Sequence, residues 1–150
     1  MSGWDIATPY TAAYVLLYKD GKLAFVLRSN TGYMDGNYGL PSGRVEKGEP
    51  FLLAAIREAR EEVGVEIDPA DLVHRLTMHR DAPADSTLWV DVYFEATKWS
   101  GEVINAEPHK HGEVAWLDPN DLPDTIVPSV RAALHAIADG DSYAEFGWGD

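Results

Sequence analysis

The sequence contains no cysteine and no long apolar run, and it is poor in positive charge. Without cysteine the chain has neither disulfide bridges nor thiolate metal sites, a composition that fits a reducing cytoplasm. No apolar stretch approaches the roughly 20 residues that a bilayer-spanning helix needs. The first residues, 1–5, lack the basic and apolar segments of a signal peptide. We therefore expect a cytoplasmic protein that makes no use of a membrane.

Acidic residues outnumber basic ones, 25 Asp and Glu against 12 Lys and Arg, which gives a formal net charge of −13. Nucleic acid backbones and anionic membranes attract basic patches, so this charge argues against a nucleic acid polymer or a membrane as partner. A small phosphorylated ligand is still compatible, because bound divalent ions dominate the local field at a phosphate site. At this length, with 45% hydrophobic residues, residues 1–150 fit one domain with a sizeable core.

Runs of β-forming residues bounded by turn signals predict the extended segments of the chain. These segments are residues 12–19, 22–28, 72–80, 87–98 and 113–117, with a short strand and turn within 40–45. Asp20-Gly21 between the first two is a strong hairpin signal. The aromatic tail, residues 143–148, is predicted to dock on the domain.

Two helices are predicted, at residues 50–63 and 128–138. Pro50 is expected at the first helical position, and Gly64 is expected to stop the first helix. Helices that alternate with strands favour packing on opposite faces of a sheet. The expected fold is therefore α/β, an α/β/α sandwich around a central mixed sheet.

The first predicted helix carries three glutamates at helical spacing, Glu58, Glu61 and Glu62. Side chains three and four residues apart share one face, where like charges repel by roughly 0.2–0.5 kcal/mol per pair. A hard divalent ion such as Mg²⁺ removes this repulsion, and it commonly combines carboxylates with phosphate oxygens. The alternative is a solvated acidic helix. The predicted packing face lies elsewhere and consists of Leu52, Ile56, Ala59 and Val63, so the glutamates are expected to be exposed.

These glutamates belong to a longer pattern, Gly43-x5-Glu49-x7-Arg57-Glu58-Ala59-x-Glu61-Glu62-x-Gly64-Val65. The pattern resembles the Nudix box, G-x5-E-x7-R-E-U-x-E-E-x-G-U with U apolar, at every fixed position. The resemblance implies the same α/β/α sandwich and the hydrolysis of a nucleoside diphosphate linked to another group X. It implies Mg²⁺ as the cofactor, with Mn²⁺ as an alternative, and a small nucleotide as the partner molecule. Because dimers are frequent among relatives, it also leaves a homodimer open.

The resemblance assigns roles within the box. Glu61 and Glu62 become the main metal ligands, and Glu58 becomes either a further ligand or the base that takes a proton from water. Arg57 lies four residues before Glu61 and is expected to hold that carboxylate, although a weak surface ion pair is the alternative. The supporting residues of the box are Gly43, Glu49 and Gly64.

Further candidates lie outside the box. Relatives often use the carbonyl just before the box glycine as a metal ligand, and this residue is Ser42, where they usually carry glycine. A carboxylate from a later loop is also expected, and Glu107 and Glu113 both qualify. Arg28 resembles a phosphate-contacting arginine, with a surface cation as the alternative. The predicted substrate-binding residues are Arg28, Tyr38 and Ser42.

Aromatic and histidine residues leave alternatives open. One of Trp4, Tyr33 and Tyr38 could stack on a base. Trp89, Tyr93 and Phe94 lie in a predicted strand, and most of them are expected in the core. His109-Lys110-His111 could reach phosphates, but a solvated loop is favoured.

The layout is nearest to MutT-like members of the family, which cleave nucleoside triphosphates to a monophosphate and pyrophosphate. Ile126 stands near the place where the antimutator enzyme reads the base with an asparagine, which weakens an oxidised-guanine assignment. Hydrolysis of ADP-ribose or of a nucleotide sugar is the alternative chemistry. A non-catalytic nucleotide sensor is a further alternative, but the presence of all four box glutamates favours a hydrolase.

Overall fold

The computed structural model describes residues 5–149, so Trp4 lies outside the described residues. The strands of this part are β1 (Tyr10–Lys19), β2 (Lys22–Arg28), β3 (Tyr38–Gly39), β4 (Ser42–Arg44), β5 (Leu72–Ala82), β6 (Thr87–Ala96), β7 (His111–Leu117) and β8 (Tyr143–Phe146). The helices are α1 (Phe51–Val63) and α2 (Pro128–Ala138), with short 3-10 turns η1 (Pro69–Asp71) and η2 (Pro83–Asp85). Within residues 5–149, neither helix has the length and apolarity to cross a bilayer.

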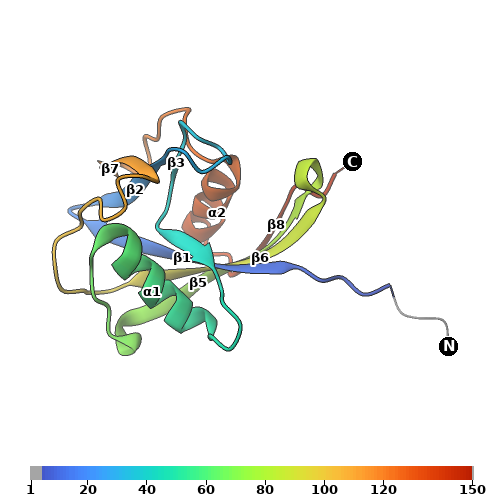
Figure 1. Cartoon of the computed structure of the whole chain (residues 1–150), viewed down its shortest axis with the longest axis horizontal. Helices are drawn as coiled ribbons and strands as arrows, with labels where there is room; N and C mark the ends of the chain where they lie inside the picture. The colour runs from blue at the N-terminus through green and yellow to red at the C-terminus, as the bar shows by residue number, and fades with distance from the viewer. Residues whose placement is uncertain (1–4, 150) are drawn as a thin grey trace.

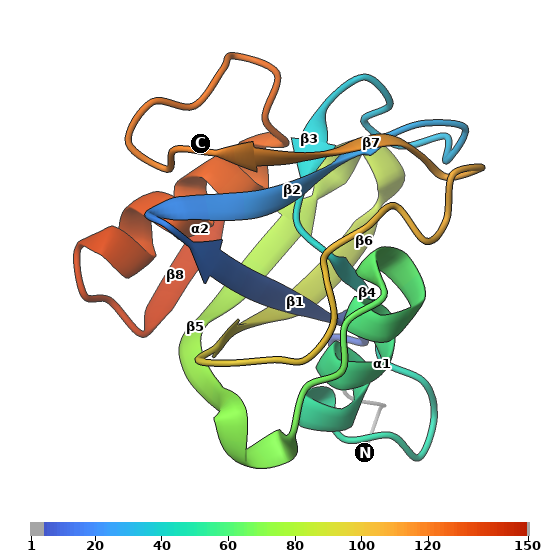
Figure 2. The same ribbon diagram turned by 90° about the vertical axis from the view of Figure 1, so that its left-hand side faces the viewer.

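The strands form one mixed sheet in the order β3-β2-β1-β6-β5-β8, while β4 pairs with β1 and β7 pairs with β2 (Figures 1 and 2). Strand β1 runs parallel to β6, and this pairing sets Tyr10 beside Trp89. Strands β5 and β6 form a long antiparallel hairpin in which Arg80 is the partner of Trp89. Tyr10, Trp89 and Arg80 are therefore lateral neighbours on three adjacent strands.

The two helices pack on opposite faces of the sheet, which confirms the α/β/α arrangement. Successive strand residues point to opposite faces. Accordingly Val15 belongs to the core beneath α1, whereas Leu16 belongs to the core beneath α2. Ala59 and Leu134 are the corresponding core residues of the two helices.

Several predicted boundaries are confirmed, and one expectation is wrong. Strand β2 and helix α2 have the predicted bounds, and Asp20 and Gly21 both have positive φ, at 53° and 76°, as a tight hairpin turn requires. Pro50 is the cap residue of α1 rather than its first helical residue, since its ψ of 153° is extended. The short strand predicted within 40–45 is β4, which pairs with β1.

The aromatic tail docks on the domain as predicted. Strand β8 adds to the sheet parallel to β5. Beyond it, Trp148 donates a hydrogen bond from Nε1 to the carbonyl oxygen of His79, at 2.9 Å. The tail thus completes the far edge of the sheet.

Candidate active site

The three glutamates of α1 differ sharply in burial. Glu61 is exposed, Glu58 is half-buried, and Glu62 is only 7% exposed. The prediction that all three are exposed is therefore wrong for Glu62, which turns toward the sheet beside the buried Val63. Leu52 and Ile56 are only partly buried. The fully buried apolar residues of α1 are Ala54, Ala55, Ala59 and Val63.

The Glu62 carboxylate is held at the edge of the sheet by two neighbours. Its Oε1 accepts a hydrogen bond from the backbone N–H of Ser42 at 2.8 Å, and its Oε2 lies 3.5 Å from Nε2 of His111. Burial raises the pKa of Glu62 well above its ordinary range, and the negative charges of Glu58 and Glu107 add to this shift. An ionised Glu62 therefore needs a cation close by.

Arg57 organises the remaining carboxylates of the box. It donates to Glu49 from Nε at 2.7 Å and from Nη2 at 3.0 Å, and to Glu58 from Nη1 at 2.7 Å. Its contact with Glu61 is longer, at 3.2 Å, and Nη2 also donates to the carbonyl oxygen of Arg44. One guanidinium thus fixes three carboxylates and ties them to the end of β4. Its strongest contacts go to Glu49 and Glu58 rather than to Glu61.

Gly43 is required by the close approach of Glu58. A Cβ atom at this position would lie 2.2 Å from Oε1 of Glu58, which is far inside van der Waals contact. No positive φ is recorded for Gly43, so its role is to leave space rather than to permit an unusual backbone conformation. Gly64 is the opposite case, because it caps α1 with φ of 73°.

Burial governs the ionisation of Glu58 as well. Desolvation raises the pKa of Glu58 to about 7, although the hydrogen bond and the positive charge of Arg57 act in the opposite direction. A carboxyl group with this pKa can exchange a proton near neutral pH, as general acid–base catalysis requires.

Glu107 and Glu113 are the two candidates for a ligand outside the box, and only Glu107 lies close to a glutamate of α1. Single atoms of Glu62, Glu107 and His111 all lie within 4.8 Å of one another. Glu113 instead accepts a hydrogen bond from the Tyr38 hydroxyl at 2.6 Å. Neither Glu113 nor Tyr38 lines the cleft described below.

His111 is not in a solvated loop, contrary to expectation. It begins strand β7 and is only 4% exposed. Burial lowers the pKa of its imidazole, and Glu107 opposes this shift. His111 precedes a short predicted strand, and nothing in the local sequence signals its burial. The burial depends on the pairing of β2 with β7, which sets Arg28 beside His111.

The donor set fits a divalent cation. Glu62 is a buried carboxylate without a full cationic partner among residues 5–149, and Glu107 places a second carboxylate beside it. Carboxylate oxygens are the donors that Mg²⁺ prefers, and an imidazole is also acceptable to Mn²⁺. The negative charge of Glu58 acts on Glu62 as well, and Arg57 links Glu58 to Glu61.

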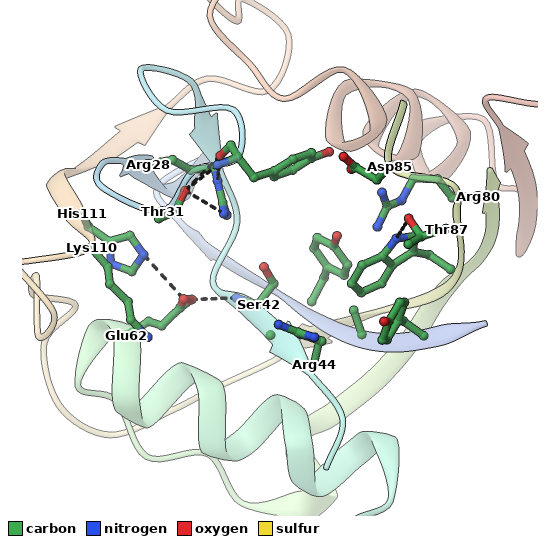
Figure 3. Close-up of a pocket in the computed structure, with 16 residues that line it drawn as sticks. Arg28, Thr31, Ser42, Arg44, Glu62, Arg80, Asp85, Thr87, Lys110 and His111 are labelled. Atoms are coloured by element: carbon green, nitrogen blue, oxygen red, sulfur yellow. Dashed lines mark hydrogen bonds and ion pairs between the residues drawn. The ribbon is translucent and has the colours of Figure 1, made fainter. Parts of the chain in front are cut away.

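A cleft of about 480 Å³ extends from Glu62 across the sheet (Figure 3). Arg28, Arg44 and Lys110 line it, together with Ser42 and Gly43. Its size falls in the roughly 300–1,000 Å³ range that is typical of small-molecule sites. A chain with a net charge of −13 thus gathers several cations around one acidic cluster.

Arg28 is held in place by the loop that follows it. Its Nε donates to the carbonyl oxygen of Tyr33 at 2.7 Å, and Nη2 donates to the Thr31 hydroxyl at 3.2 Å. Its guanidinium also lies over the Tyr33 ring, 5.2 Å from the centroid. Arg28 is therefore a fixed cation of the cleft rather than a free surface charge.

The far part of the cleft contains residues that the sequence analysis does not assign to a site. They come from strands β1, β5 and β6 and from the turn between β5 and β6, and they are Tyr10, Tyr14, Arg80, Asp85, Thr87 and Trp89. Trp89 was expected in the core with Tyr93 and Phe94, but it lines the cleft, whereas the other two are buried. Strand alternation places Trp89 on the same face as Tyr93, but it does not show that this end of β6 lines a cleft.

The family model described as NUDIX domain matches residues 8–137 of this chain. The chain belongs to the Nudix family. An RNA pyrophosphohydrolase of Erythrobacter litoralis is 28% identical over 148 residues, which cover 89% of this chain and 90% of the relative. An RNA pyrophosphohydrolase of Novosphingobium aromaticivorans is 31% identical over 118 residues, 67% of this chain and 71% of the relative.

Among solved structures, the crystal structure of a MutT NUDIX hydrolase from Burkholderia pseudomallei superposes with a TM-score of 0.79. It is 27% identical, and the match covers 85% of this chain and 97% of the other. This Nudix protein is accordingly a hydrolase that acts on pyrophosphate linkages.

Proposed function

We propose that this Nudix protein is a Mg²⁺-dependent nucleoside triphosphate pyrophosphohydrolase that releases a nucleoside monophosphate and pyrophosphate. The observation that carries the proposal is the composition of the cleft. Glu62 stands at one end beside Glu107 and Glu58, and the cations Arg28, Arg44 and Lys110 line the walls. An acidic cluster faced by guanidinium groups suits a metal-bound polyphosphate, because the ion and the cations share the phosphate charge.

The metal ion would be held by Glu62 and Glu107, with His111 adjacent and Glu58 and Glu61 nearby. When bound, a divalent ion neutralises phosphate oxygens and lowers the pKa of coordinated water. The Ser42 N–H orients the Glu62 carboxylate for this role. We place Glu107 in the ligand set in preference to Glu113, since Glu113 is engaged by Tyr38.

Glu58 is the residue best suited to take the proton from the attacking water. Its raised pKa of about 7 makes it a competent base near neutral pH, and Arg57 fixes its position. As water attacks phosphorus, the bond to the oxygen between the α- and β-phosphates breaks, and pyrophosphate leaves. Arg28, Arg44 and Lys110 are placed to balance the charge on the remaining phosphate oxygens.

The test is a product analysis of a mixed pool of nucleoside triphosphates, oxidised nucleotides, nucleotide sugars and ADP-ribose, incubated with Mg²⁺. We expect monophosphate and pyrophosphate from triphosphates, detected by mass spectrometry, and no turnover after chelation. In ¹⁸O-labelled water, the label identifies the phosphorus that is attacked. Consumption of ADP-ribose or of a nucleotide sugar in place of triphosphates would overturn the substrate assignment.

Glu62→Gln, with Glu113→Gln as its control, tests the residue assignment. Both changes remove one carboxylate charge, but only Glu62 lines the cleft. We expect Glu62→Gln to abolish turnover and Glu113→Gln to retain it. Equal, near-zero turnover in the native protein and in Glu62→Gln, over every substrate, would favour the non-catalytic nucleotide sensor.

A second candidate substrate is the 5′-triphosphate end of RNA, which the names of two relatives suggest. It carries the same triphosphate and needs the same metal site. The net charge of −13 opposes a long polyanion, so we rank it below free nucleotides. A competition between GTP and a 5′-triphosphorylated oligonucleotide at equal concentration separates the two. Preferential consumption of GTP supports free nucleotides, and preferential consumption of the oligonucleotide supports RNA ends.

A further inference from the structure

Four side chains form a ladder across the end of the cleft remote from Glu62. They alternate as cation, ring, ring and cation, in the order Arg44, Tyr10, Trp89 and Arg80. The Arg44 guanidinium lies 5.6 Å from the Tyr10 ring centroid, and the two rings lie 5.0 Å apart. The Arg80 guanidinium lies 4.9 Å from the Trp89 centroid. We call this set the cross-strand ladder, since its members come from β4, β1, β6 and β5.

Arg80 is the most rigid member of the ladder. Its Nε donates to Asp91 at 2.6 Å and its Nη2 at 3.2 Å, and the side chains of this pair are 8% and 0% exposed. A buried ion pair generally adds no stability over an apolar pair of the same size. What this pair does provide is a guanidinium of fixed orientation at the wall of the cleft, stacked against Trp89. Among residues 5–149, no group accepts a hydrogen bond from Arg80 Nη1.

Within the ladder, the Trp89 ring is flanked on both sides. Trp89 has Tyr10 on one side and Arg80 on the other, as the strand order requires. A ligand that reaches this end therefore meets ring edges and polar groups. The charged groups of β5 and of the turn after it that line this end are Arg80, which only donates, and Asp85, whose carboxylate only accepts (Figure 3).

From this juxtaposition we infer that Arg80 and Asp85 select substrates by the edge of the nucleobase, and that they favour keto bases over amino bases. Guanine and uracil both present a carbonyl oxygen beside a ring N–H. Arg80 donates to the carbonyl, and Asp85 accepts from the N–H. Adenine and cytosine present an amino donor and an unprotonated ring nitrogen in the reverse order. In the orientation that suits guanine and uracil, both contacts would therefore set like groups together. This inference rests on the proposed function, in which the triphosphate of the substrate lies at the Glu62 end of the cleft.

The test compares kcat/KM for GTP, ITP, UTP, ATP and CTP with Mg²⁺. ITP keeps the carbonyl and the ring N–H of guanine but lacks its exocyclic amino group, so it isolates the edge in question. We expect GTP, ITP and UTP to exceed ATP and CTP by at least about 10-fold, as one well-placed charged hydrogen bond predicts. Equal kcat/KM for all five nucleotides would overturn the inference and leave the proposed function intact.

Two variants assign the selectivity to residues. Arg80→Lys keeps the positive charge opposite Asp91 but loses the planar set of N–H donors of the guanidinium group. Asp85→Ala removes a carboxylate that is exposed. We expect each variant to lower kcat/KM for GTP and UTP more than for ATP and CTP, so that the ratio collapses. The matched control is Arg75→Lys, because Arg75 also pairs across β5 and β6, with Glu95, but lies outside the cleft. It should leave the ratio unchanged.

A uniform loss of activity on all nucleotides in Arg80→Lys, with the ratio preserved, would count against base selection and assign Arg80 a structural or phosphate-binding role. If the native protein turns over no triphosphate, the proposed function fails, and calorimetry then decides the inference separately. In that measurement the imidodiphosphate analogues of GTP and ATP bind with Mg²⁺ in place of substrate. The GTP analogue should bind at least about 10-fold more tightly, and equal binding overturns the inference.

Discussion

The two ends of the cleft are built in different ways. The glutamate end draws most of its groups from residues 42–62, where one turn, one cap and one helix follow each other along the chain. The ladder end draws Tyr10, Arg44, Trp89 and Arg80 from four strands, of which only β5 and β6 are consecutive in the chain. A site made of local segments leaves a pattern that can be read in the sequence. A site made by strand pairing leaves none.

The two ends also handle charge differently. At the glutamate end, the single guanidinium of Arg57 contacts three carboxylates, and Glu62 stays short of a cation. At the ladder end, Arg80 and Asp91 neutralise each other one to one, in nearly complete burial. The first arrangement is ready to accept a metal ion, whereas the second is already complete and rigid.

The largest expected effect comes from breaking the buried pair of the ladder end. Asp91→Ala leaves Arg80 buried without its partner, so the free energy of unfolding should fall by about 3–5 kcal/mol. Urea denaturation measures this change. Its control is Glu95→Ala, which breaks the half-exposed Arg75–Glu95 pair of the same two strands and should cost about 1 kcal/mol or less. Similar losses in both variants would show that burial does not distinguish the pairs.

The next effect tests the close packing of the glutamate end. Gly43→Ala places a Cβ atom where the Glu58 carboxylate lies, so Glu58 must move by an ångström or more. We expect kcat/KM to fall about 100-fold, the size of effect typical of such a misplacement. In Gly39→Ala the added Cβ would meet nothing closer than 3.7 Å, and activity should change about twofold or less. Full activity in Gly43→Ala would refute the packing argument.

A smaller effect concerns pH. The folded-state pKa of Glu58, about 7, lies above its ordinary value of 4.5, so folding favours the protonated carboxyl. The stability associated with this group is present below pH 4.5 and is lost as pH rises through about 7. In the metal-free protein the loss should be on the order of 1–3 kcal/mol. Thermal unfolding of the native protein and of Glu58→Gln, from pH 4.5 to pH 8 in the presence of a chelator, measures it.

The native protein must be compared with Glu58→Gln, because His111 changes the stability in the opposite direction at low pH. Its lowered pKa means that folding disfavours its protonation, so that group destabilises the fold as pH falls below its ordinary value of 6.5. His111 is present in both proteins and cancels in the difference. The native protein should lose more stability toward pH 8 than Glu58→Gln does. Parallel pH profiles would remove Glu58 as the cause.

The smallest expected effect separates the two later carboxylates. Glu107→Gln should weaken Mg²⁺ binding at least about 10-fold, since it removes a charge beside Glu62. Glu113→Gln should leave the affinity within about twofold, because Glu113 bonds Tyr38 outside the cleft. Isothermal titration of Mg²⁺ into each variant makes the comparison. The reverse order would return Glu113 to the ligand set.

The sequence predicted much of the fold because hairpin, cap and helix signals act over a few residues. Asp20-Gly21, the stop at Gly64 and the bounds of α2 all depend on local backbone preferences, and the structure has them where expected. Burial of individual polar residues could not be predicted in the same way. Glu62 and His111 are buried because β4 and β7 approach the end of α1, and no local rule anticipates that approach.

The sequence alone determined the family and the chemistry, because the box glutamates, Arg57 and Gly43 stand at fixed intervals within 23 residues. Only the tertiary structure decided which later carboxylate joins them and what lines the far end of the cleft. Helical periodicity fixes contacts between residues three and four apart. Pairing between distant strands depends instead on the register of the whole sheet, so Arg80, Trp89 and Tyr10 become neighbours only once β1, β5 and β6 have assembled.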